Sequence, residues 1–188
     1  MNIDKYSRQI SATSLNTQYC INNATIAVLG LNSLGSEILR NLCMIGVNNI
    51  YICDDEYINQ EDLTCNFLLY YPIDNSQYVN LSRAHIIADN ITRLYKSLNI
   101  QIVTKNDLCN FKYDLLYLTL HQECIQKWNK ICRKKSAYFI CAYVDHVYHK
   151  IWTWCDPGKM HTCNNVTGEK QLLINVQYNN DKYLFLFE

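Results

Sequence analysis

The sequence lacks an excess of charge of either sign and any long apolar run. Its 188 residues carry 17 basic and 17 acidic side chains, so the formal net charge is zero. A broad basic field for nucleic acid is therefore not expected. No stretch of 18 apolar residues and no secretory signal is present, which predicts a soluble, intracellular chain without a membrane partner. The length fits one domain with a sizeable core.

The sequence also lacks the cysteine and histidine spacings of metal sites. No two of its ten cysteines form a C-x-x-C pair, and the five histidines show no ligand spacing. Most cysteines lie in apolar stretches, which predicts buried free thiols rather than disulfides; examples are Cys43, Cys53, Cys132, Cys141 and Cys155. A nucleophile elbow, a Walker loop and paired catalytic carboxylates are absent as well. We expect no metal site.

Glycine is scarce, with five residues, yet two of them mark the most informative segment. The loop Gly30-Leu31-Asn32-Ser33-Leu34-Gly35 joins an apolar run, Ala24–Leu29, to a predicted helix, and Asp54 follows at the offset of a ribose-binding acid. Asn32 replaces the middle glycine that lets the backbone approach a phosphate. Gly30, Asn32, Gly35 and Asp54 are thus predicted to form a vestigial nucleotide site. Asp54 is either a ribose ligand or a turn-forming, helix-capping aspartate.

The order of the apolar patterns predicts a doubly wound, mostly parallel, Rossmann-like α/β sheet. A helical arm, residues 5–22, precedes the first strand, and residues 56–80 form a long connection of the functional or interfacial kind. Further strands are predicted at 49–53, 100–104, 113–119, 137–144 and 149–154, and helices at 34–45, 81–98 and 124–132. We assign 1–155 to this domain and 156–188 to a C-terminal loop and β-hairpin within it, with Asn179-Asn180-Asp181 as the hairpin turn.

Five motifs in register resemble one family. They are Tyr6-Ser7-Arg8-Gln9, the loop and helix at 30–47, and the segments 52–56, 61–67 and 82–84. Together, over roughly residues 5–155, they resemble the adenylation domains of ubiquitin-like-protein-activating enzymes. The resemblance implies ATP- and magnesium-dependent adenylation of a modifier's C-terminal glycine by a pair of related halves. One half holds the ATP site and the thioester cysteine, and the other has degenerated.

Several positions depart from the active half's pattern. Asp62 and Cys65 stand where the resemblance implies an asparagine and an arginine, and Arg83 stands at the catalytic lysine. The aspartate expected after the strand 113–119 has no counterpart in Leu120-His121-Gln122. The acidic neighbours of Cys65 argue against a nucleophile, so core or interface packing is expected there. These losses indicate the non-catalytic half, which binds no cofactor itself; ATP and magnesium belong to a larger catalytic partner.

Arg8 would be an ordinary exposed arginine if judged alone. The resemblance implies instead that it reaches across the dimer to the partner's ATP, where a guanidinium stabilises developing charge. Within the family the chain most resembles the SUMO-activating members, which implies SUMO as the modifier, and we expect the nucleus and cytoplasm as the location. The alternatives are the inactive half of a ubiquitin- or NEDD8-activating enzyme and a stand-alone nucleotide-binding Rossmann enzyme.

Overall fold

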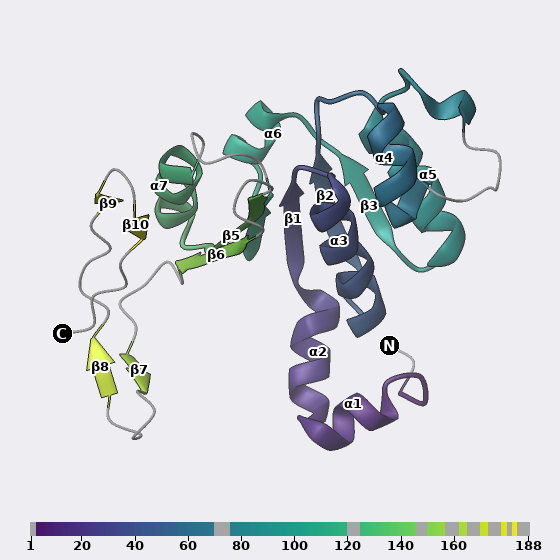
Figure 1. Ribbon diagram of the computed structural model, residues 1–188. Helices are drawn as coiled ribbons and strands as arrows, with labels where there is room; N and C mark the ends of the chain where they lie inside the picture. Colours follow the sequence, from purple (N-terminus) through teal and green to yellow (C-terminus); the bar gives the residue numbers. More distant parts are fainter. Residues whose placement is uncertain are drawn as a thin grey trace.

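A six-stranded sheet organises the chain. The computed structural model describes residues 3–69, 76–119, 125–145 and 150–156, and the short strand segments 162–164, 170–172, 178–179 and 182–183. The strand order is β3-β2-β1-β4-β5-β6, with β1 to β5 parallel and β6 antiparallel to β5 (Figure 1). The strands are β1 Thr25–Leu29, β2 Asn49–Cys53, β3 Asn99–Ile102, β4 Leu115–Leu118, β5 Tyr138–Asp145 and β6 Lys150–Asp156. The predicted doubly wound sheet is confirmed.

Helices cover both faces of this sheet. Successive residues of β1 point to opposite faces, so Ile26 and Val28 join one core while Ala27 and Leu29 join the other. The first core packs under α3 (Ser33–Ile45) and α5 (Arg83–Leu94), and the second under α6 (Lys105–Asn110) and α7 (Ile125–Lys135). Burial on both faces explains why β1 is continuously apolar from Ile26 to Leu29.

The predicted N-terminal arm consists of α1 (Ser7–Ala12) and α2 (Leu15–Asn23). Ser14 caps α2 by accepting a hydrogen bond from the backbone N–H of Thr17. The arm lies below the amino-terminal end of β1, at the edge opposite to the loop after β1 (Figure 1).

Two short helices were missed from the sequence. Residues 56–80, predicted as a connection, contain α4 (Gln60–Cys65) and the 3-10 turns Phe67–Leu69 and Ser76–Tyr78. The helix α6 lies between β3 and β4, where two strands were expected in succession. Both helices have six residues, too few to show a helical period, but each begins with a capping box, Asn59 with Asp62 and Thr104 with Asp107.

The described residues of the C-terminal segment form two strand pairs. Thr162–Asn164 (β7) pairs with Lys170–Leu172 (β8), so the expected loop 156–169 includes a strand. Tyr178–Asn179 (β9) and Lys182–Tyr183 (β10) pair antiparallel around the predicted turn. The turn residues 180–181 lie outside the described residues, as does the segment 120–122 after β4.

Candidate functional site

The loop between β1 and α3 keeps its two glycines for steric reasons. Gly30 has a φ of 97°, a left-handed conformation that favours glycine. A Cβ atom on Gly35 would lie 2.1 Å from the Gly30 carbonyl oxygen, so no side chain fits there. Both glycines are therefore required by the strand–turn–helix geometry itself, whether or not a ligand binds.

Asn32 occupies the start of α3 with its own side chain. Its Oδ1 accepts a hydrogen bond from the Gly35 N–H at 2.9 Å, and its Nδ2 donates to the Thr119 carbonyl at 3.0 Å. The amide thus caps the helix and ties it to the end of β4. The first N–H groups of a helix form an anion site when they are free. Here one of them is already satisfied by the residue that replaces the middle glycine.

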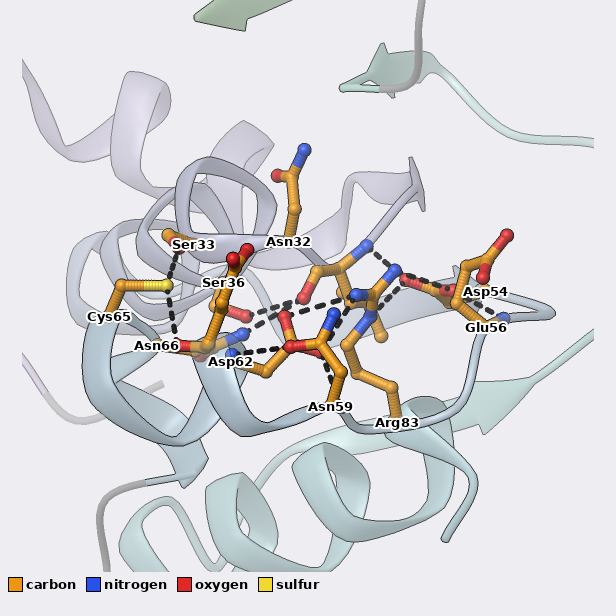
Figure 2. Close-up of polar contacts among 12 residues, drawn as sticks. Asn32, Ser33, Ser36, Asp54, Glu56, Asn59, Asp62, Cys65, Asn66 and Arg83 are labelled. Atoms are coloured by element: carbon orange, nitrogen blue, oxygen red, sulfur yellow. Dashed lines mark hydrogen bonds and ion pairs between the residues drawn. The ribbon is translucent and has the colours of Figure 1, made fainter. Parts of the chain in front are cut away.

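Asp54, at the carboxyl end of β2, belongs to a buried ion-pair network with Arg83 and Asp62 (Figure 2). The Asp54 Oδ2 atom accepts hydrogen bonds from the Leu31 N–H at 2.6 Å and Arg83 Nε at 2.9 Å. Its Oδ1 atom accepts from the Glu56 N–H at 2.8 Å and Arg83 Nη2 at 3.1 Å. Four donors therefore engage this carboxylate, and a ribose hydroxyl would have to displace one of them.

Asp62 completes the network from α4. Arg83 Nη1 lies 3.2 Å from each Asp62 carboxylate oxygen, and Asp62 Oδ2 also accepts from the Asn59 N–H. Arg83 thus binds Asp54 through Nε and Nη2 and binds Asp62 through Nη1. Lysine does not provide such a fork of donors. The interaction fixes α4 and α5 around the end of β2.

Burial makes this network costly to break. The side chains of Asp54, Arg83 and Asp62 are 0%, 8% and 8% exposed. Burial tends to lower the pKa of Arg83, but the hydrogen bonds and negative charges of Asp54 and Asp62 outweigh it and raise that pKa above its ordinary value. Arg83 therefore remains charged and holds the two carboxylates together.

Cys65 lies beside the loop, at the end of α4. Its Sγ atom accepts a hydrogen bond from the Ser33 hydroxyl at 3.0 Å and donates to the Glu61 carbonyl at 3.1 Å (Figure 2). The thiol is exposed, so Cys65 does not pack in the core; of the two predicted environments, the interface stays a prediction. The predicted burial of Cys43, Cys53, Cys132 and Cys141 as free thiols is confirmed; Cys155 has no described side chain.

Arg8 does not join this site. It is exposed on α1, and the next residue, Gln9, donates from Nε2 to the Ile45 carbonyl at the far end of α3. A helix of 13 residues is roughly 20 Å long. The Gly30–Gly35 loop at the other end of α3 is therefore beyond the reach of Arg8 in the same chain.

Sequence reasoning named Gly30, Asn32, Gly35 and Asp54 together, and the structure brings them to one sheet edge. The sequence did not predict that Arg83 pairs with Asp54 and Asp62. Arg83 is 29 positions from Asp54 and 21 from Asp62, and no sequence pattern links residues at these separations. Within the described part of the chain, no cluster of His, Cys, Asp or Glu could hold a metal ion. No helix in that part is long and apolar enough to span a bilayer.

These features define a Rossmann-like domain of the adenylation type. Its loop between β1 and α3, Gly30–Gly35, is called the filled loop below, because the Asn32 side chain occupies the N-terminal end of α3. The chain belongs to the ThiF family, whose model matches residues 6–148. A crystal structure of E. coli MccB with ATP shares the fold, with a TM-score of 0.64 and 20% identity over 76% of this chain and 45% of that one.

The chain is also similar to two curated proteins whose names describe the activation of SUMO or of ubiquitin-like modifiers. The SUMO-activating enzyme subunit aos-1 of Caenorhabditis elegans is 28% identical over 143 residues, 72% of this chain and 41% of that protein. The ubiquitin-like modifier-activating enzyme 7 of Homo sapiens is 25% identical over 177 residues, 92% of this chain and 17% of that protein. The chain thus spans less than half the length of either relative.

Proposed function

We propose that this chain is the non-catalytic subunit of a heterodimeric SUMO-activating enzyme, equivalent to SUMO-activating enzyme subunit 1. A larger catalytic subunit binds ATP and magnesium, adenylates the C-terminal glycine of the modifier and accepts it as a thioester. This chain supplies one face of the dimer and Arg8. We place the complex in the nucleus and cytoplasm, with no nucleic acid or membrane as partner.

The filled loop is the observation that carries this proposal. The side chain of Asn32 caps α3 where a phosphate would otherwise meet free N–H groups. Asp54 already accepts four hydrogen bonds, two of them from Arg83. These residues do not fit a nucleotide without rearrangement, so we assign no chemical step to this chain's own loop.

The position of Arg8 supports action on a partner. The arginine is exposed and shows no hydrogen bond or ion pair among the described residues, and its own loop lies at the opposite end of α3. A guanidinium supplied in trans can stabilise negative charge that builds on a triphosphate. The site it serves therefore belongs to the catalytic subunit in our proposal.

The alternatives differ in what the isolated chain must do. The inactive half of a ubiquitin- or NEDD8-activating enzyme has the same architecture and differs in the modifier it supports. A stand-alone nucleotide-binding Rossmann enzyme must bind ATP or NAD without a partner, and the filled loop argues against this.

The proposal is tested by ATP–pyrophosphate exchange with the complex reconstituted from this chain, the catalytic subunit of the same organism and SUMO. Arg8→Ala should slow exchange by on the order of 10²-fold, the loss expected when one group that stabilises developing charge is removed. Arg93→Ala is the matched control, because Arg93 is also exposed on a helix and forms no ion pair among the described residues. Unchanged exchange with Arg8→Ala would refute the trans role, and exchange only with ubiquitin or NEDD8 would correct the modifier.

A further inference from the structure

The arm that carries Arg8 is attached to the domain mainly by amide side chains. Gln9 of α1 and Gln18 of α2 donate to the same acceptor, the Ile45 carbonyl, at 3.2 and 3.0 Å. Asn22 donates to the carbonyl of Gly46, the residue that ends α3. The last carbonyl groups of a helix lack partners within the helix. Three side chains of the arm therefore satisfy carbonyl groups at the end of α3.

The attachment of the arm to the end of α3 has little support from buried apolar side chains. No residue of α1 is buried, and the only buried residues of α2 are Gln18 and Asn22, both polar. Tyr6 is the one buried hydrophobic side chain among residues 3–24. The amide oxygens of Gln18 and Asn22 also lack hydrogen-bond partners in the described part of the chain, which weakens the attachment further. A segment held by few buried contacts opens at low free-energy cost.

We propose that Gln9, Gln18 and Asn22 are positioning residues that form an amide clamp on the end of α3 and thereby set the location of Arg8. This inference rests on the proposed trans role of Arg8. Gln9 is the most direct member, because it follows Arg8 in the same turn of α1 and is only partly buried. The clamp also gives the Tyr6-Ser7-Arg8-Gln9 motif a physical meaning. Tyr6 packs against Gly46 and Gln9 binds Ile45, so both neighbours hold Arg8 at one place.

The first experiment measures kinetics of the reconstituted complex with Gln9→Met, which keeps the length of the side chain and removes its donor. The exchange kcat should fall about fivefold, the effect of one net hydrogen bond, while the KM for ATP stays unchanged. In an Arg8→Ala background Gln9→Met should have no further effect, because it acts through Arg8. Gln126→Met, the same change on the exposed surface of α7, should leave the kcat unchanged.

The outcomes separate the two proposals. An ineffective Arg8→Ala overturns the trans role itself. If Arg8→Ala slows exchange but Gln9→Met does not, or if Gln9→Met lowers kcat equally in the Arg8→Ala background, the clamp is refuted.

Hydrogen exchange of the isolated chain gives a second readout that needs no partner. Gln9→Met and Gln18→Met should speed amide exchange in α1 and leave β1 protected, whereas Gln126→Met should change neither. Equal protection of α1 in all variants would contradict the clamp.

Discussion

Removing the positive charge from the buried network should destabilise the domain strongly. Arg83→Met leaves Asp54 and Asp62, whose side chains are 0% and 8% exposed, without their shared counter-ion. Breaking a buried ion pair from one side costs about 3–5 kcal/mol, because the remaining charge stays desolvated. For a domain of this length, 1 kcal/mol corresponds to roughly 2–4 °C in Tm, so we expect a decrease of about 6–20 °C.

Urea and thermal unfolding measure this effect, with Arg40→Met as the control. Arg40 pairs with Glu37 at 2.7 Å, but the two side chains are 31% and 42% exposed. An exposed pair contributes about 0–1 kcal/mol, so the control should lose no more than that. If Arg83→Met costs no more than Arg40→Met, the network does not hold the site together as described.

Three further predictions concern the loop, the end of α3 and the thiols. Asn32→Ala removes the cap of α3 and should cost about 1 kcal/mol in urea unfolding; no loss would mean that the cap contributes nothing. Gly46→Ala should lower the free energy of unfolding by about 1–3 kcal/mol, because φ is 101° and the new Cβ would lie 2.7–2.9 Å from atoms of Asn22, Tyr6 and Gln18. An unchanged free energy of unfolding would show that the N-terminal arm moves away from the new Cβ without cost. Burial raises the pKa of Cys43 and of Cys53 from 9.0 to about 12. Their contribution to stability is therefore complete below pH 9.0 and is lost as the pH rises through about 12. A free energy of unfolding that does not change with pH in this range would exclude this contribution.

The fold was predictable because the long elements have strong patterns. The helix α3 repeats its buried residues at helical spacing, and β1 is apolar from Ile26 to Leu29 because both of its faces are covered. The helices α4 and α6 lack such a period. Their capping boxes, at Asn59 and Thr104, were the available signal and depend on only two residues each.

The site was predictable only in part. The damaged loop was visible because Asn32 interrupts a known spacing, and Asp54 was visible because it follows a strand. The partners of Asp54 were not, since an ion pair between β2 and α5 depends on how far the chain turns between them. Asp62 and Arg83 were each interpreted as a loss, whereas the structure shows that they bind one another.

The stoichiometry of ATP binding tests the central claim most directly. Isothermal titration of ATP and magnesium into the isolated chain should give no binding heat, and titration into the reconstituted heterodimer should give one site, in the catalytic subunit. The chain alone would then be the non-catalytic half of the pair. Binding of ATP by the isolated chain, or two sites in the heterodimer, would contradict this account.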